Sequence, residues 1–123
     1  MIEFKNVSKV YDNGSVALDD VCLTINDGEF VLICGHSGAG KSTLFKLLTH
    51  EVVPDTGAVI VDDFDVTRMK RSKIPKLRRK LGVVFQDFRL LPNKTVSENI
   101  AFALEVIEEK PKVIKEKVSH VLE

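Results

Sequence analysis

A glycine-rich octapeptide at residues 35–42, GHSGAGKS, constrains the fold of this chain more than any other stretch of its sequence. It follows a continuous apolar run at residues 30–34 and precedes a segment whose leucines recur at helical spacing. Glycines let the backbone curl tightly, so that successive N–H groups point into the bend and toward the start of the following helix. A buried strand, a tight turn and a helix in this order are typical of an α/β fold.

The same octapeptide matches the pattern GxxxxGK[ST], in which backbone N–H groups and the positive end of a helix hold the phosphates of a nucleotide. We expect Lys41 to reach the β- and γ-phosphates and Ser42 to coordinate Mg²⁺. We expect Thr43 to donate a hydrogen bond to a phosphate nearer the base. The other predicted binding residues belong to the loop itself: Gly35, Ser37, Gly38, Ala39 and Gly40.

Hydrophobic periodicity predicts the elements around this loop. The pair Asp27-Gly28 predicts a hairpin turn, and the pair Thr95 and Glu98 has the spacing of a helix capping box. Continuous apolar runs are typical of strands that are covered on both faces. Strands are therefore expected at residues 2–11, 21–25, 30–34, 58–61 and 81–85, with helices after Lys41, after Thr95 and after Pro111.

Composition limits the other possibilities. The 123 residues fit one domain, and 18 basic and 18 acidic side chains cancel, which gives no general reason to expect a nucleic-acid partner. The first residues contain no apolar signal core, and no apolar run approaches the ~20 residues that span a bilayer, so we expect a soluble cytoplasmic protein. Cys22 and Cys34 lack metal-binding spacing and are interpreted as small buried hydrophobes in strands.

Two charged features leave alternatives open. Asp62 and Asp63 follow a short strand and Asp87 follows an apolar run, so each could serve Mg²⁺, although all three positions are more typical of turns or loops. Residues 66–80 carry eight basic side chains and no acidic one. A solvated helix face is the favoured interpretation of this segment, and a surface for anionic lipid is the alternative. No aromatic residue interleaves with these charges to stack on nucleic-acid bases.

Taken together, these motifs resemble the ABC-type ATP-binding subunits. Tyr11 precedes the glycine-rich loop where this family places an aromatic that stacks on adenine, and Gln86 in VVFQD matches the family's Q-loop. The resemblance implies that Gln86 contacts Mg²⁺ and the attacking water and reports the nucleotide state to a membrane partner. It also implies a P-loop NTPase fold of the ABC ATP-binding type, here as an N-terminal half with an antiparallel β subdomain and an incomplete parallel-sheet core.

The stretch RRKLGVVFQDFRLLPNKTV, together with GEFVLICGHSGAGKST, is most similar to the cell-division ATP-binding subunits of that family, and this likeness extends over residues 1–123. It implies MgATP as ligand, a homodimer of the full-length protein and a peripheral position at the inner face of the cell membrane. It also implies an integral membrane partner that controls peptidoglycan hydrolases. Phe88, Leu90 and Leu91 occupy the place where the family docks a coupling helix of its membrane subunit.

Several parts of the family pattern do not occur in residues 1–123, which hold no LSGGQ-like signature, no apolar strand ending in Asp-Glu and no switch histidine. We therefore expect a partial nucleotide-binding domain from a longer protein, truncated before the signature motif and the Walker B strand. By itself it should not hydrolyse ATP. The alternatives are a subunit of another ABC importer or exporter, or a small P-loop kinase or GTPase-like switch that uses Asp62 or Asp87. No NKxD-type guanine reader is present.

Overall fold

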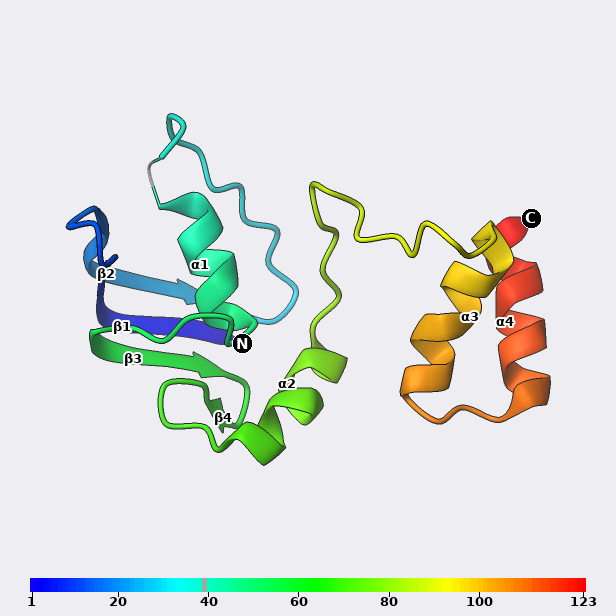
Figure 1. Cartoon of the computed structure of the whole chain (residues 1–123). Helices are drawn as coiled ribbons and strands as arrows, with labels where there is room; N and C mark the ends of the chain where they lie inside the picture. The colour runs from blue at the N-terminus through cyan, green and yellow to red at the C-terminus, as the bar shows by residue number, and fades with distance from the viewer. Residues whose placement is uncertain (39) are drawn as a thin grey trace. The chain divides into compact units, whose positions relative to one another are not determined.

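The computed structural model describes residues 1–38 and 40–123, and these divide into two compact units, Met1–Leu81 and Gly82–Glu123. The first unit contains every strand that the structure describes, and the second contains two helices and the loop that precedes them (Figure 1). Within the described residues, no helix is both long and apolar enough to cross a membrane.

The first unit is built on a four-stranded sheet in the order β2-β1-β3-β4, in which every pair of neighbouring strands is antiparallel. In the register, Phe4 lies opposite Leu23 on one side and Val59 on the other, so three apolar side chains from three strands meet. The strands are β1 (Ile2–Val10), β2 (Val16–Ile25), β3 (Thr56–Val61) and β4 (Phe64–Asp65).

An irregularity in β1 decides which of its side chains face the core. The pairing register with β2 shifts between Phe4 and Val7, and Asn6 between them has a positive φ of 48°. Side chains three residues apart point to opposite faces of a regular strand, and a bulge restores them to the same face. Both Phe4 and Val7 are in fact buried. The side-chain amide of Asn6 donates a hydrogen bond to Asp20 Oδ1 at 2.9 Å, which links the bulge to β2.

Two helices cover this sheet through a few apolar side chains. From α1 (Lys41–Leu48), Leu44 and Leu47 join the buried cluster that includes Phe4 and Val59. A short 3₁₀ helix, η1 (Arg71–Lys73), leads into α2 (Ile74–Lys80), whose Leu77 is fully buried in the same cluster. The core of the first unit is therefore shared by sheet, α1 and α2.

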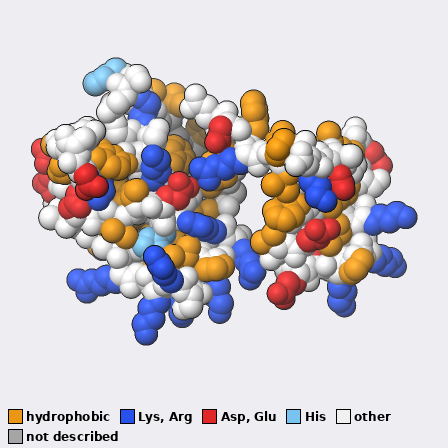
Figure 2. All heavy atoms as spheres, in the orientation of Figure 1, with side chains coloured by type: hydrophobic (Ala, Val, Ile, Leu, Met, Phe, Trp, Pro, Cys, Tyr) orange, Lys and Arg blue, Asp and Glu red, His pale blue; other side chains and the backbone are white. Residues whose placement is uncertain are grey.

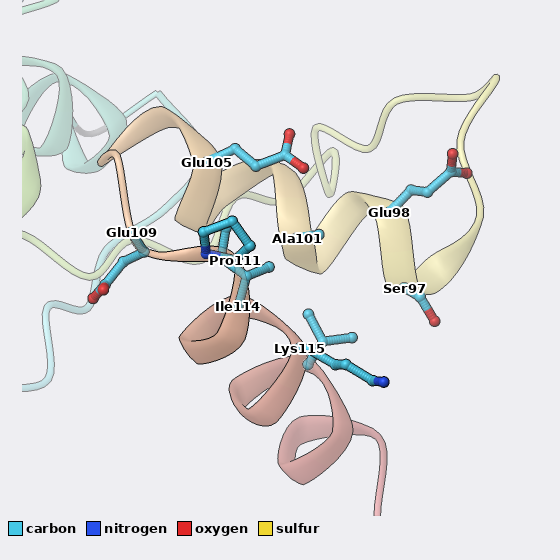
Figure 3. Close-up of a pocket in the computed structure, with 9 residues that line it drawn as sticks. Ser97, Glu98, Ala101, Glu105, Glu109, Pro111, Ile114 and Lys115 are labelled. Carbon is cyan, nitrogen blue, oxygen red and sulfur yellow. The ribbon is translucent and has the colours of Figure 1, made fainter.

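The second unit is a hairpin of α3 (Val96–Val106) and α4 (Pro111–Leu122). The predicted capping box is confirmed, because Thr95 N–H donates to Glu98 Oε2 at 2.7 Å and Glu98 N–H donates to Thr95 Oγ1 at 3.3 Å. Pro111 begins α4, where its missing N–H costs no hydrogen bond. A shallow groove between the two helices is lined by residues that include Ala101, Pro111 and Ile114 (Figure 3).

The two strands predicted from continuous apolar runs are not formed. Residues 30–34 and 81–85 have no regular secondary structure, and Phe30 and Val84 are 95% and 97% exposed. A strand needs a neighbour to satisfy its backbone N–H and C=O groups. None of the strands in the described part of the chain pairs with either run. The turn at Asp27-Gly28 is present, but it leads into an irregular segment rather than a paired strand.

The prediction that both cysteines are buried in strands is wrong. Cys22 lies in β2 as expected, but its side chain is on the exposed face of the sheet, next to the bulge, where Asn6 N–H donates to its sulfur at 3.3 Å. Cys34 is exposed because the strand predicted around it does not form. Neither thiol is oxidised to a disulfide in the structure.

Candidate nucleotide site

The glycine-rich loop joins α1 through a residue that only glycine can occupy. Gly40, the N-cap of α1, has a φ of +83° and is buried against the start of β2. A Cβ atom placed on Gly40 would lie 2.1 Å from the carbonyl oxygen of Ala17. Gly38 also has a positive φ, of 82°, but open space surrounds it. Gly40 therefore allows α1 to pack closely against the sheet, whereas Gly38 only bends the loop.

The amine of Lys41 spans the loop and holds its two ends together. Its Nζ donates to the carbonyl oxygen of Gly35 at 2.5 Å and to that of His36 at 2.6 Å. The side chain is only half-buried, so its positive charge remains at the surface of the loop. The His36 carbonyl was not a predicted contact, because the pattern GxxxxGK[ST] leaves that position unspecified. Ser37 and Ser42 are both exposed. The prediction for Ala39 lies outside the described residues.

The beginning of α1 has the electrostatic character of an anion site. Its N-cap, Gly40, offers no side-chain oxygen to the first turn, and that turn contains no acidic residue. The carbonyl of Gly40 accepts from Thr43 N–H at 2.9 Å and from Leu44 N–H at 3.1 Å. Unsatisfied N–H groups of a helix start carry a partial positive charge, and a phosphate is the natural acceptor for them.

The structure brings two of the predicted binding residues into direct contact. The hydroxyl of Tyr11 lies 3.2 Å from Thr43 Oγ1, within hydrogen-bond distance. Tyr11 follows the last residue of β1, whereas Thr43 is in the first turn of α1 and is buried. The aromatic ring predicted to stack on adenine is therefore linked to the same helix start that carries the predicted phosphate-binding residues.

Asp55 holds the end of β1 from which Tyr11 projects. Its carboxylate accepts a hydrogen bond from Val10 N–H at 2.6 Å and from Lys9 Nζ at 3.0 Å. The Val10 N–H, followed by the Lys9 amine, lowers the pKa of Asp55 below its ordinary value. The carboxylate therefore remains charged at neutral pH. Because its pKa is lower in the folded state, the Asp55 carboxylate stabilises the fold at pH values above the pKa that it has in the unfolded chain. This contribution is lost as the pH falls through the folded-state pKa.

The predicted Q-loop residues lie in the second unit. Gln86 is exposed in a turn with Asp87, and Phe88 and Leu90 beyond it are 78% and 67% exposed. Asn99 of α3 anchors the end of this loop: its Oδ1 accepts from Leu91 N–H at 2.8 Å and its Nδ2 donates to Leu91 O at 3.2 Å. Asn99 was not predicted from the sequence, although its position one turn after the capping residue Thr95 is a signal. Contact of Gln86 with Mg²⁺ stays a prediction.

Two of the three carboxylates considered as alternative Mg²⁺ ligands are paired with cations of the protein. Asp62 lies in the turn between β3 and β4, where it accepts from the amino terminus at 2.8 Å and from Lys80 Nζ at 3.3 Å. These partners, the amino terminus first, lower the pKa of Asp62. Asp63 shares the turn, and Asp87 pairs with Arg89 at 3.6 Å. Within residues 1–38 and 40–123, no group of three His, Cys, Asp or Glu side chains could hold a metal ion.

A glycine-bent loop, a lysine that spans it and an uncapped helix start are typical of the nucleotide site of P-loop proteins. The family model for the ABC transporter matches residues 18–123. The chain belongs to this family, and its fold is that of the ABC ATPases.

Among curated relatives, the cell division ATP-binding protein FtsE of Bacillus subtilis (strain 168) is 53% identical over 123 residues, which is all of this chain and 54% of that protein. FtsE of Mycobacterium tuberculosis is 47% identical over 124 residues. The methionine import ATP-binding protein MetN of Helicobacter acinonychis is 41% identical over 123 residues, which is all of this chain and 38% of that protein. The chain spans about half the length of the FtsE proteins that it matches.

Solved structures show the same fold. A dimeric ATP-binding cassette in a post-hydrolysis state, bound to ADP and Pi, aligns with a TM-score of 0.86 and 34% identity over 98% of this chain and 55% of its own. The cbiO1 protein of Clostridium perfringens, described as part of an ABC transporter complex, aligns with a TM-score of 0.83 and 28% identity. This alignment covers 98% of this chain and 48% of that one.

Proposed function

We propose that this chain is the MgATP-binding, N-terminal half of an ATP-binding subunit of the FtsE type. In this proposal the intact protein couples ATP binding and hydrolysis to a membrane partner resembling FtsX in bacterial cell division. Identities of 47–53% to proteins named FtsE extend over the whole chain, whereas an identity of 41% over the whole chain is found with MetN, and these values support the choice of FtsE over MetN. The alternative of another ABC importer rests on the MetN match and on a phosphonate import protein, PhnC, at 48% identity over 103 residues.

The proposal that the protein binds a nucleotide rests mainly on the groups at the start of α1. Lys41 presents a cation at the loop, Gly40 leaves the first turn free of a side-chain cap, and the exposed Ser42 hydroxyl lies beside them. These groups fit a triphosphate and its magnesium ion, because phosphate oxygens accept from N–H groups and a hydroxyl oxygen is a suitable Mg²⁺ ligand. When bound, MgATP would supply the phosphoryl group that is transferred to water.

The role of the Tyr11 ring can be tested separately from that of its hydroxyl. We expect Tyr11→Ala to weaken MgATP binding by the full-length protein about 10-fold, because a stacked aromatic is worth roughly 1–3 kcal/mol per base. Tyr11→Phe keeps the ring and loses only the contact with Thr43, so it should bind nearly as tightly as the parent protein. Isothermal titration calorimetry measures both. Equal losses in the two variants would show that the hydroxyl, and not stacking, is the important group.

Hydrolysis is proposed only for the longer protein. Phosphoryl transfer to water needs a positioned phosphate, a metal and an oriented water, and residues 1–123 hold no candidate for the base that polarises water. We propose that Lys41 and Ser42 hold the phosphates and the metal, and that Gln86 senses them. A purified 123-residue sample is expected to release no phosphate from ATP in a coupled assay. Release that disappears in Lys41→Ala would contradict this expectation.

The loop after Gln86 is the proposed contact with the membrane partner. Phe88 and Leu90 expose apolar side chains, and the two hydrogen bonds between the Asn99 side chain and the Leu91 backbone hold the loop in place. An exposed apolar loop on an ordered anchor is suitable for receiving a helix of another protein. Dimerisation of the full-length protein and a peripheral position at the inner face of the membrane belong to the same proposal.

We expect Leu90→Asp to abolish co-purification with the membrane partner while MgATP affinity stays within about twofold. The reason is that a carboxylate would be desolvated in the apolar contact but remains in water in the free protein. Leu122→Asp makes the same change at another exposed leucine, at the end of α4, and serves as the control. Loss of nucleotide binding together with partner binding in Leu90→Asp would instead indicate that Leu90 supports the fold.

A further inference from the structure

The basic segment, residues 66–80, concentrates the positive charge of a chain that is neutral overall. It carries eight of the 18 basic side chains and none of the 18 acidic ones, so its formal charge is +8 and that of the remaining chain is −8. The fold does not need most of this separation, because apolar side chains of the segment pack into the core and only two of its eight basic side chains make structural contacts. Val66 and Leu77 are buried in the common cluster of the first unit.

Two of the eight basic side chains have a structural role. Arg78 Nε donates to the carbonyl oxygen of Thr49 at 2.9 Å, just after α1, and so attaches α2 to the end of that helix. Lys80 pairs with Asp62 at 3.3 Å and lies 5.5 Å from the centre of the Phe64 ring. With Leu77 these contacts hold α2 in one orientation on the unit.

The other six side chains form what we call the basic surface. All six are exposed, and none of them has an acidic partner among the residues that the structure describes. Lys76 and Arg79 are three residues apart on α2, on the side away from the buried Leu77. Blue side chains project from the first unit around α2 in Figure 2. The basic surface comprises Arg68, Lys70, Arg71, Lys73, Lys76 and Arg79.

We propose that the basic surface docks on the headgroups of an anionic phospholipid bilayer. Its charges are distributed over the turn before η1, over η1 and over α2, and this spread along the chain suits a layer of phosphates better than a single small anion. The segment has no aromatic side chain to stack on bases, so a nucleic acid is the weaker candidate. The choice of lipid rests on the proposed function, which places the protein beside a membrane.

The test is sedimentation of the full-length protein with vesicles, without any membrane partner. Vesicles of 30% phosphatidylglycerol in phosphatidylcholine should bind the protein at 50 mM salt, and vesicles of pure phosphatidylcholine should not. The triple variant Lys73→Gln, Lys76→Gln and Arg79→Gln should bind the anionic vesicles roughly 100-fold more weakly, since each charge near the surface contributes about fivefold. Binding by the parent protein should also fall steeply at 300 mM salt.

The matched control changes the net charge equally at a different place: Lys110→Gln, Lys112→Gln and Lys115→Gln around the start of α4, all exposed in the structure. Equal losses in the two triple variants, no preference for anionic vesicles, or tighter binding to a duplex oligonucleotide would each overturn the proposal. The MgATP affinity and the thermal unfolding of the triple variant at Lys73, Lys76 and Arg79 should match those of the parent protein. Loss of MgATP binding in the parent protein itself would count against the proposed function and not against this surface.

Discussion

Replacement of Lys41 by alanine is expected to weaken MgATP binding by the full-length protein about 100-fold. The amine lies at the loop, where it donates to the carbonyl oxygens of Gly35 and His36. A phosphate offers this cation stronger, charge-assisted hydrogen bonds, and hydrogen bonds to a charged group are worth about 1.5–3 kcal/mol. Adding the direct charge attraction brings the expected loss near 3 kcal/mol, or roughly two powers of ten in affinity.

Calorimetry with MgATP measures this loss, and Lys46→Ala is the control. Lys46 is exposed on the last turn of the same helix, so its removal changes the net charge equally without touching the loop. Its nucleotide affinity should remain within about twofold of the parent value. Unchanged affinity in Lys41→Ala would refute the assignment of the glycine-rich loop as the phosphate site. Thermal unfolding should be similar for both variants, because neither side chain is fully buried.

Gly40→Ala is expected to lower the free energy of unfolding by about 3 kcal/mol or more. Two effects add: a left-handed backbone costs a residue with a Cβ about 1–2 kcal/mol, and the new methyl would meet the carbonyl of Ala17. Because the distance to that oxygen would be 2.1 Å, either α1 or the start of β2 must move. Movement of α1 would also loosen the packing of Leu44 and Leu47 on the sheet.

Gly38→Ala separates the two effects, since Gly38 has nearly the same φ but nothing within 4 Å of a new Cβ. It should cost only about 1 kcal/mol, the penalty for the left-handed backbone alone. Urea unfolding of the two variants without nucleotide gives both values under conditions where phosphate contacts play no part. If Gly38→Ala and Gly40→Ala destabilise the protein equally, the close approach of α1 to Ala17 does not govern stability.

Much of the local structure was predictable, because it depends on residues close together in the chain. The capping box joins Thr95 and Glu98 across three residues, and Lys41 lies five or six residues from the carbonyls that it contacts. The helix after the glycine-rich loop and the turn at Asp62-Asp63 follow from equally local patterns. The prediction of an ABC-type P-loop fold is confirmed by the family match and by the solved structures.

The errors concern segments whose structure depends on distant partners. The apolar runs at residues 30–34 and 81–85 have the composition of buried strands, but strand formation depends on pairing with another segment. The same cause explains Cys34, which would be buried only if its strand were paired and covered. Cys22 was misassigned because the bulge and the face of β2 are set by the register with β1.

By itself, the sequence determined the phosphate-binding motif, the family, the helices and the charge of the basic segment. These depend on residue types at short spacing, where glycine conformations, capping hydrogen bonds and helical periodicity act within a few residues. Only the tertiary structure decided that Tyr11 meets Thr43, that Gly40 is confined by Ala17, and which basic side chains of residues 66–80 remain exposed. Each of these depends on contacts between segments far apart in the chain, which local chemistry does not specify.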